Sequence, residues 1–308
     1  MLQTKAYFLV GGLMHLDLTD LRLFTMIVDA GSITAGGERA GLALASASAR
    51  VRGMEEQVGV PLLERERRGV RPTPAGLALL HHARLMTRQI EQMRGELGEY
   101  SHGLKGHVRL LANTAAASEF LPERLAGFLS LHPNIDIDLD ERSSTSVARD
   151  VGEGLADLGV AADHADFAGL ERFPFCADRL VLAVPHGHPW ETRQEMPFAE
   201  ALSAEFVGLA GDSALHQHLT AHATRAGGRM RVRVRAYGLD TVCRMVALGA
   251  GLAVVPETAV RRWANQLNLA SVHLTDSWAN RELFVVARRL DALPPQARQL
   301  AEHLIADA

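Results

Sequence analysis

The chain of 308 residues contains few cysteines, few aromatic residues and no long hydrophobic segment. Its two cysteines, Cys176 and Cys243, cannot form a disulfide framework and have apolar neighbours, so we expect two core thiols in a reducing compartment. The apolar stretch YFLVGGLM at 7–14 is shorter than the roughly 20 residues that span a bilayer. It also has none of the flanking features of a signal peptide. We therefore expect a soluble, cytoplasmic protein that has no membrane partner.

The sequence also lacks the usual catalytic motifs. No nucleophile elbow, phosphate-binding glycine loop or dinucleotide fingerprint occurs in the required order, and the GAG at 249–251 precedes a predicted strand when it should follow one. Among the 14 histidines, His218 and His222 stand four residues apart on a predicted helix, a spacing that zinc sites use. No cysteine cluster accompanies them, so we expect exposed histidines, no metal, no cofactor and no enzymatic activity.

Lysine is nearly absent, so the abundance of arginine reflects composition and says nothing about how any arginine binds. The net charge is only −4, yet one short segment is strongly basic. Four arginines fall within seven positions against the single acid Glu66: Arg65, Arg67, Arg68 and Arg71. This local surplus indicates either an anionic partner or a solvated charged loop.

The segment before these arginines predicts three short helices. The first spans about 17–30 and ends at Gly31, and Ser32 then caps a second helix whose glycines and alanines permit close packing. The third begins with ALASASARVRG. Its core positions recur at helical spacing, namely Ala47, Val51, Met54 and Val58. Its opposite face carries short hydroxyls and then cations: Ser46, Ser48, Arg50 and Arg52.

A helix enters the DNA major groove when its first turn carries small side chains, while nearby hydroxyls and arginines contact bases and phosphates. The alternative is an ordinary alanine- and serine-rich surface helix. The following PLLERERRGVRPTPAG predicts two short strands joined at Gly69. Together these elements form a winged helix-turn-helix, whose arginines would lie on the phosphate backbone or in the minor groove.

Thr73 and Pro74 then begin a long helix with a narrow apolar stripe. The stripe repeats every 3.5 residues: Leu79, Ala83, Met86, Ile90, Met93 and Leu97. Such a stripe is typical of pairing with a second copy, which would place two DNA-binding heads on two related half-sites. Gly98 and Gly103 are expected to end the helix.

From residue 107 onward, strands and helices alternate as in a parallel α/β sheet. A second α/β unit runs from about 176 to 270, and the last strand and helix return to the first. Two such lobes joined by two connections enclose a cleft in which ligands bind. In RMRVRVRAY the alternating side chains of Arg229, Arg231, Arg233 and Arg235 form one cationic face. That face could attract an anionic effector, be solvated, or contact another subunit.

Several motifs, in this order, resemble the LysR-type transcriptional regulator family. In the first hundred residues they are AGSITAGGERAG and SARVRGMEEQVGVPLLERERRGVRPTPAG. The later ones are EFLPERLAGFLSLHPNIDIDLDE, GLADLGVAA, HGHPW and MVALGAGLAVVP. The resemblance implies a recognition-helix serine at Ser48 and a wing arginine at Arg65. Where the family often has Gln-Pro, this chain has Leu44 and Ala45, and it has Pro72 in place of a leucine.

Because leucine cannot make the paired adenine contact of glutamine, base contacts would come from Ser46, Arg50, Leu44 or Ala47. The predicted DNA-binding set also includes Ser32, Arg52 and the four wing arginines. In the sensor lobes the resemblance implies an effector site at Asn113, Thr114 or Ala115, Ser143, Ser144, Gly211, Ser213, Gly238 and Asp240. Short hydroxyls beside helix starts suit a small anion, although Ser143 and Ser144 could simply cap a helix.

We therefore predict an α/β protein with an N-terminal all-α winged helix-turn-helix (14–73) after an extension (1–13). A dimerising linker helix (74–102) joins it to a two-lobed sensor resembling periplasmic binding proteins (103–308). The first lobe is expected at about 103–175 and 275–308, and the second at about 176–274. Such a regulator would bind double-stranded DNA and a small effector, act as a homodimer or homotetramer, and alter access of RNA polymerase. The alternative is a stand-alone small-molecule binding protein without DNA binding.

Overall fold

The computed structural model describes residues 16–66, 69–100, 106–210, 213–264 and 266–306. Within 91–100 it describes the backbone, and Met93 is the one residue there whose side chain is also described. The predicted extension at 1–13 lies outside these ranges. The chain divides into two compact units, Met1–Arg94 and Gly95–Ala308, which we name the N-terminal and C-terminal units. Within the described residues, no helix is long and apolar enough to cross a membrane.

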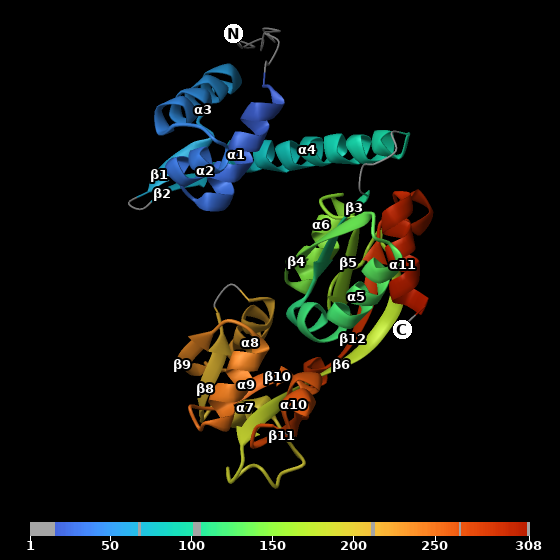
Figure 1. The fold of residues 1–308 in the computed structure, drawn as a ribbon. Helices are drawn as coiled ribbons and strands as arrows, with labels where there is room; N and C mark the ends of the chain where they lie inside the picture. The colour runs from blue at the N-terminus through green and yellow to red at the C-terminus, as the bar shows by residue number, and fades with distance from the viewer. Residues whose placement is uncertain (1–15, 67–68, 101–105, 211–212, 265, 307–308) are drawn as a thin grey trace, which may run out of the picture. The chain divides into compact units, whose positions relative to one another are not determined.

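Three helices form the body of the N-terminal unit (Figure 1): α1 (Leu18–Ala30), α2 (Ile33–Arg39) and α3 (Leu44–Val58). The side chain of Asp17 caps α1 by accepting a hydrogen bond of 2.7 Å from the backbone N–H of Asp20. The helix ends at Gly31, whose positive φ of 61° glycine adopts without strain. Both helix limits agree with the sequence prediction.

The packing of α1 against α2 depends on a glycine. A Cβ at Gly36 would lie 2.4 Å from the Cα of Ile27, so no larger residue fits there without a shift of the backbone. This confirms the prediction that the small residues of α2 permit close approach. The buried core of the unit consists of Leu23, Phe24, Ile27, Ala47, Val51, Met54, Leu62 and Leu80.

A short hairpin and a long helix complete this unit. The antiparallel strands β1 (Leu63–Glu66) and β2 (Gly69–Pro72) form the wing, and the N–H of Val70 donates to the carbonyl of Gly31 at 2.9 Å. The helix α4 spans Pro74–Tyr100 and ends between Gly98 and Gly103, the two glycines expected at its end. The buried hydroxyl of Thr73 caps it by accepting from the N–H of Gly76 at 3.0 Å, as the sequence predicts.

The C-terminal unit is an α/β structure. Its strands are β3 (Gly106–Ala112), β4 (Ile135–Glu141), β5 (Leu158–Ala162), β6 (Glu171–Pro185), β7 (Glu195–Met196), β8 (Glu205–Leu209), β9 (Arg231–Ala236), β10 (Ala253–Pro256), β11 (Leu269–Leu274) and β12 (Asn280–Ala287). Its α-helices are α5 (Leu121–Leu131), α6 (Ser144–Gly152), α7 (Phe198–Ala201), α8 (Ala214–Arg225), α9 (Leu239–Ala247), α10 (Glu257–Ala264) and α11 (Pro295–Ala306). Three short turns accompany them: the π-turn η1 (Ala116–Phe120) and the 3-10 turns η2 (Ser277–Ala279) and η3 (Leu290–Ala292).

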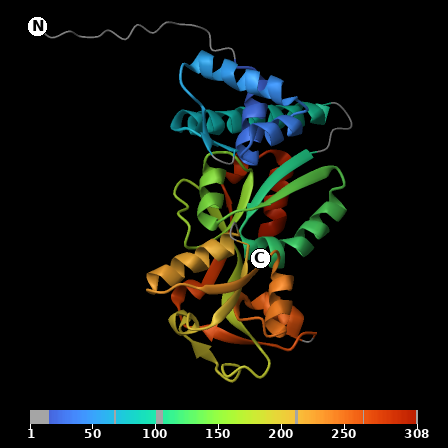
Figure 2. The ribbon, with the colours of Figure 1, turned by 90° about the vertical axis from the view of Figure 1, so that its left-hand side faces the viewer.

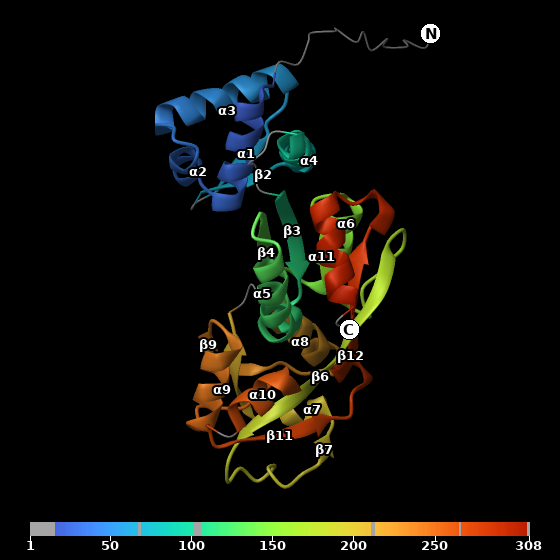
Figure 3. The same cartoon turned by 45° about the vertical axis from the view of Figure 1, so that its right-hand side comes forward.

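The long strand β6 runs through both halves of the C-terminal unit (Figures 2 and 3), and its two ends belong to different hydrophobic cores. In the main sheet the order is β4-β3-β5-β12-β6-β11-β7, with β10 also paired to β6, while β8 and β9 form a separate parallel pair. Phe175 of β6 belongs to the core shared by β3, β5, α5 and α11. Leu180 to Val184 of the same strand belong to the core shared by β8, β10, α8 and α9. We name these two parts the first and second lobes.

Candidate functional sites

The first turn of α3 is exposed and carries mostly small side chains. Leu44 is 52% exposed, Ala45 and Ser46 are exposed, and Ser48 is half-buried. This matches the surface that the sequence predicts for groove binding. Ala47 is fully buried in the core of the unit, so the expectation that it contacts a base is wrong.

Two other predicted DNA-binding residues have structural partners. Arg50 turns toward the start of α1, where its guanidinium lies 2.6 Å from Asp20 and 3.4 Å from Asp17. The hydroxyl of Ser32 accepts from the N–H of Ala35 at 3.4 Å and thus caps α2. Arg52 on α3 is exposed. Contact of these residues with DNA stays a prediction.

The wing presents two kinds of arginine. Arg71 is held by Glu64 at 2.7 Å and Glu66 at 3.2 Å. Arg65 is exposed and has no ion-pair partner among the residues that the structure describes. Arg67 and Arg68 lie outside the described ranges. Arg65 is therefore the described wing cation whose charge is least compensated.

The predicted dimerisation stripe on α4 changes character along the helix. Leu79 is half-buried against the core of the N-terminal unit, and Ala83 is fully buried. A fully buried Ala83 cannot contact a second copy directly, which corrects the prediction for that residue. Met86 and Met93 are 53% and 47% exposed. Ile90 is half-buried, and the side chain of Leu97 lies outside the described residues.

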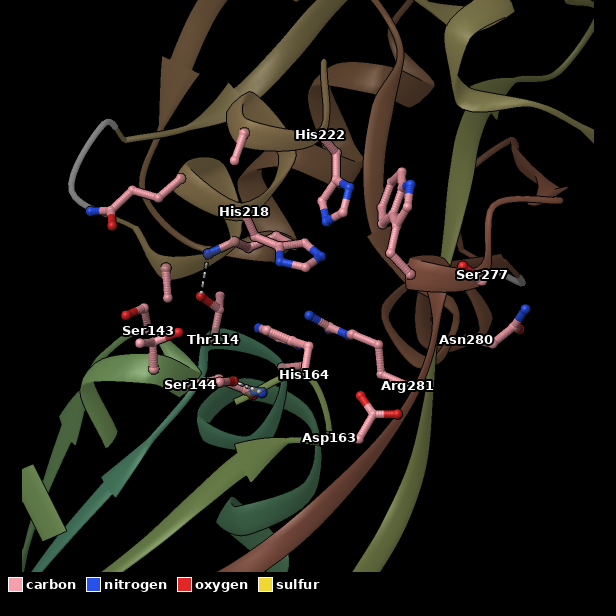
Figure 4. Close-up of a pocket in the computed structure, with 18 of the residues that line it drawn as sticks. Thr114, Ser143, Ser144, Asp163, His164, His218, His222, Ser277, Asn280 and Arg281 are labelled. Carbon is pink, nitrogen blue, oxygen red and sulfur yellow. Dashed lines mark hydrogen bonds between the residues drawn. The ribbon is translucent and has the colours of Figure 1, made fainter. Parts of the chain in front are cut away.

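A polar cavity of about 610 Å³ lies between the two lobes of the C-terminal unit (Figure 4), and we name it the lobe pocket. The first lobe contributes the ends of β3 and β5 and the start of α6, and the second contributes one face of α8. The segment from η2 into β12, which passes from the second core to the first, completes the lining. The first-lobe lining includes Asn113, Thr114, Ala115, Ser143, Ser144, Thr145, Asp163 and His164. The rest of the lining includes Leu215, Gln217, His218, His222 and Arg225 at α8, and Trp278, Asn280 and Arg281 in the segment from η2 into β12.

A buried hydrogen-bond network fixes two of the predicted effector residues. The side-chain carbonyl of Asn113 accepts from the N–H of Ala116 at 2.9 Å, and its amide group donates to the hydroxyl oxygen of Ser144 at 3.3 Å. The same oxygen accepts from the N–H of Ala162 at 3.0 Å. With two donors directed at its oxygen, the buried hydroxyl of Ser144 has only its proton left to offer.

Other predicted residues join the lobes to each other. The hydroxyl of Thr114 donates to Glu141 at 2.5 Å and accepts from the N–H of Leu215 at 3.1 Å. Glu141 also accepts from the N–H of Ala214 at 3.3 Å. The start of α8 in the second lobe is thus capped by first-lobe side chains. The hydroxyl of Ser213 lies 3.4 Å from that of Thr114.

The remaining predicted effector residues do not share one site. Ser143 caps α6 by accepting from the N–H of Ser146 at 3.2 Å, the structural role that the sequence left open. Ser213 and Gly238 line a separate cavity of about 320 Å³. Asp240 accepts from the indole N–H of Trp263 at 2.8 Å and lines neither cavity, so its contact with an effector stays a prediction. Gly211 lies outside the described residues.

Sequence reasoning missed the histidines of the lobe pocket. His218 and His222 are half-buried and line the pocket, although we expected them to be exposed. His164, which follows β5, joins them from the first lobe. Their four-residue spacing on a helix was the available signal, but it does not reveal which face is covered. In the described part of the chain, no group of three or more His, Cys, Asp or Glu residues could hold a metal ion.

One residue of the pocket lining, Arg281, belongs to a buried ion pair. Arg281 of β12 pairs with Asp178 of β6, and their side chains are 5% and 1% exposed. Burial raises the pKa of Asp178, while the charge of Arg281 opposes this rise. The Nε atom of Arg281 is buried without a hydrogen-bond partner in the described structure. Oδ1 of Asp178, the ion-pair partner of Arg281, is likewise buried without a hydrogen-bond partner among the described residues.

The arginine-rich strand and the cysteines take no part in this pocket. The arginines of β9 are exposed, and both Arg231 and Arg233 pair with Glu205. Their exposure agrees with the alternative of a solvated outer face, and β9 does not line the lobe pocket. Desolvation raises the pKa of Cys176 and of Cys243 to about 12. Both thiols pack in the hydrophobic cores, as the sequence predicts.

Family models match both units. Residues 18–77 match the bacterial regulatory helix-turn-helix protein, lysR family, and residues 101–308 match the LysR substrate binding domain. The nitrogen assimilation regulatory protein nac of Klebsiella aerogenes is 28% identical over 295 residues, 94% of each chain. The HTH-type transcriptional regulator CysL of Bacillus subtilis is 24% identical over 263 residues, 85% of this chain and 88% of CysL. The DNA-binding transcriptional dual regulator OxyR of Escherichia coli is 24% identical over 213 residues, 69% of this chain and 70% of OxyR.

Solved structures share the fold. The crystal structure of CbnR, a LysR family transcriptional regulator, is 19% identical with a TM-score of 0.64, covering 95% of this chain and 99% of CbnR. Full-length CbnR in complex with its target DNA gives a TM-score of 0.62 at 19% identity, covering 95% and 100%.

A helix-turn-helix unit followed by a two-lobed α/β unit defines a DNA-binding transcriptional regulator with an effector-binding domain. The chain belongs to the LysR family of these regulators, and not to a family of enzymes. The alternative of a stand-alone binding protein does not hold, because residues 18–77 match the DNA-binding part of the family.

Proposed function

We propose that a small anionic molecule bound in the lobe pocket controls this regulator. The hydroxyl of Ser144 is the observation that supports this most directly. Its oxygen already accepts from Asn113 and Ala162, so the group offers only a proton. A buried donor without an acceptor is costly, and an oxyanion is the strongest acceptor that could satisfy it.

Two further features favour an anion over a neutral ligand. The guanidinium of Arg281 contributes a cationic group to the pocket lining, and Asp178 compensates part of its charge. The start of α6 contributes Ser144 and Thr145 to the pocket lining, and the positive end of a helix dipole favours negative charge. Hydroxyl, guanidinium and helix start together form a site with an excess of donors.

We also propose that the chain acts as a homodimer or a higher oligomer on double-stranded DNA. Met86 and Met93 are exposed, lie seven residues apart on α4, and form an apolar seam suited to a second copy. Two heads joined in this way would contact two half-sites, and a ligand that shifts the lobes would change how the DNA is held. Access of RNA polymerase in the cytoplasm would change with it.

A thiol-based response is a weaker alternative. Some relatives carry the name hydrogen peroxide-inducible genes activator. Reactive cysteines have lowered pKa values and are accessible, whereas Cys243 is fully buried and Cys176 is partly buried. The raised pKa of each thiol opposes formation of the thiolate that peroxide oxidises. The burial and raised pKa values of the two cysteines therefore favour regulation by a bound ligand over regulation by thiol oxidation.

A thermal unfolding screen tests the proposed anion site. The full chain is heated with a panel of small carboxylates, phosphate and sulfate, and with the neutral amides of the same carboxylates. We expect one or more anions to raise Tm of the wild type and of S203A, whose exposed serine lies away from the pocket. S144A should lose this stabilisation and retain DNA binding. Stabilisation by the neutral amides alone, or an unchanged anion effect in S144A, would contradict the proposal.

A further inference from the structure

Three histidines from the two lobes meet in the lobe pocket, and the anion site described above gives them no role (Figure 4). The ring centres of His164 and His218 are 4.8 Å apart, and those of His218 and His222 are 4.6 Å apart. On its other side, the ring of His222 stacks on Trp278 at 4.4 Å. We name His164, His218 and His222 the histidine cluster.

One ring nitrogen of the cluster lacks a hydrogen bond. Among the described residues, Nε2 of His218 is buried and has no partner. Figure 4 shows His164, His218 and Arg281 directed toward the same part of the pocket. A neutral imidazole has one donor and one acceptor nitrogen, whereas both nitrogens donate when the ring is protonated. The cluster can therefore change the hydrogen-bonding character of the pocket by taking up a proton.

The charged groups that face the cluster come from several elements: Arg225 on α8, Arg281 on β12, Asp163 after β5 and Asp276 before η2. Asp178 is engaged by Arg281 in the buried ion pair. Arg225 lies on the same helix as His218 and His222, and its guanidinium is 3.4 Å from the ring nitrogens of His222. The two arginines oppose protonation of the cluster, and the carboxylates favour it.

Desolvation is the largest influence on all three rings, and it lowers their pKa values. The pKa of His218 falls to about 3, because Arg281, Arg225 and the other two histidines add to the effect of desolvation. The cluster is therefore neutral near pH 7 in this structure. A negative charge brought into the pocket would raise the pKa values of the three histidines.

We propose that an oxyanion bound in the lobe pocket draws a proton onto the histidine cluster, so that the anion and the proton bind together. This inference rests on the proposed anion site. A neutral nitrogen lone pair repels an oxyanion, whereas a protonated imidazole donates to it in a charge-assisted hydrogen bond. Because the rings are in contact, a charge on one opposes a charge on the next, and one proton belongs to the cluster as a whole.

The sign of the coupling follows from the pKa change. The cluster has a higher pKa in the complex than in the free protein, so anion affinity rises as the pH falls through the pKa of the complex. Above that pKa the affinity does not depend on the cluster. For one linked proton the affinity changes by at most about tenfold per pH unit. A rise in anion affinity toward acid is therefore the signature of this pocket.

Sulfate is a suitable probe, because it stays fully ionised across the pH range in which histidine titrates. The full chain, with labelled histidines, is titrated by NMR with sodium sulfate and with sodium chloride at equal ionic strength. We expect sulfate to raise the apparent pKa of the cluster, and its affinity to weaken between about pH 6 and about pH 8. H218Q and H222Q should bind sulfate with a weaker pH dependence.

The matched control is H216Q, on the same helix. His216 lines a different cavity, beside Val207 and Leu219, so H216Q should keep the wild-type pH dependence. Sulfate binding that requires Ser144 but leaves every histidine pKa unchanged would overturn the proton coupling and retain the anion site. No sulfate binding at any pH would overturn both. Unfolding curves of each variant show whether the fold is intact. If either H218Q or H222Q does not fold, the other still tests the proposal.

Discussion

Glu119 of η1 is covered by Arg262 of α10, and their ion pair joins the first lobe to the second. The carboxylate oxygen lies 2.5 Å from the guanidinium, and the side chain of Glu119 is 1% exposed against 43% for Arg262. Desolvation raises the pKa of Glu119, and Arg262 partly offsets this rise. A buried first-lobe carboxylate therefore depends on a second-lobe cation.

Removing this cation should destabilise the C-terminal unit in a pH-dependent way. In R262A the carboxylate of Glu119 stays buried without its partner, which we expect to cost about 1–3 kcal/mol of unfolding free energy. The pKa of Glu119 is above its unfolded value and should rise further, so stability should fall as the pH increases through this range. Urea unfolding at about pH 4.5 and about pH 8 should show the larger loss at the higher pH.

The matched control for this prediction is the neighbouring variant R261A. Arg261 pairs with Glu257 one helical turn away and is 72% exposed. Exposed pairs of this kind contribute little, so R261A should change stability by less than about 0.5 kcal/mol. Equal losses in R261A and R262A would mean that the lobe-to-lobe pair has no special role.

The two kinds of wing arginine should differ in their contribution to DNA affinity. Arg65 has no ion-pair partner among the described residues, whereas Arg71 is paired with Glu64 and Glu66. R65A should weaken binding to all sequences and lower the salt slope of log K by about 1. R71A should have a smaller effect, because its charge is already compensated. Fluorescence anisotropy at several salt concentrations checks both, and the reverse order would remove Arg65 from the interface.

The exposed part of the α4 stripe should carry the self-association. M86E and M93E place a charge in the proposed seam, so each should raise the dimer dissociation constant by about tenfold or more. L77E changes a leucine on the same helix that is 56% exposed but lies outside the stripe, and it should leave association intact. Sedimentation velocity measures all three. Unchanged association in both methionine variants would place the dimer contact elsewhere.

The N-terminal unit could be predicted from the sequence because its signals are local. Asp17 and Gly31 mark the two ends of α1, and Thr73 caps α4. Gly36 of α2 lies against Ile27. Caps, turns and helical periodicity act within a few residues, so spacing alone reveals them. Ala83 was misjudged because a heptad stripe does not show where a helix leaves its own core. The point at which α4 leaves the core of its own unit depends on tertiary packing.

The effector pocket was harder to predict because distant segments form it. Asn113 follows the strand β3 and Ser144 begins the helix α6. Their positions could therefore be predicted from strand and helix ends. Arg281 and Asp178 are 103 residues apart and pair only because β12 lies beside β6. The histidine cluster similarly depends on α8 facing the end of β5. Periodicity shows a helix, but the sheet arrangement decides which of its faces lines a pocket.

The most direct test of the proposed regulation measures DNA binding with and without the anion that stabilises the wild type most. DNase footprints and affinities are determined for the wild type and S144A on the same genomic fragments. We predict that the anion changes the footprint or shifts the affinity of the wild type by about 5- to 150-fold, and that S144A binds DNA without responding. An anion that saturates the pocket but leaves wild-type DNA binding unchanged, or that acts equally on S144A, would contradict it.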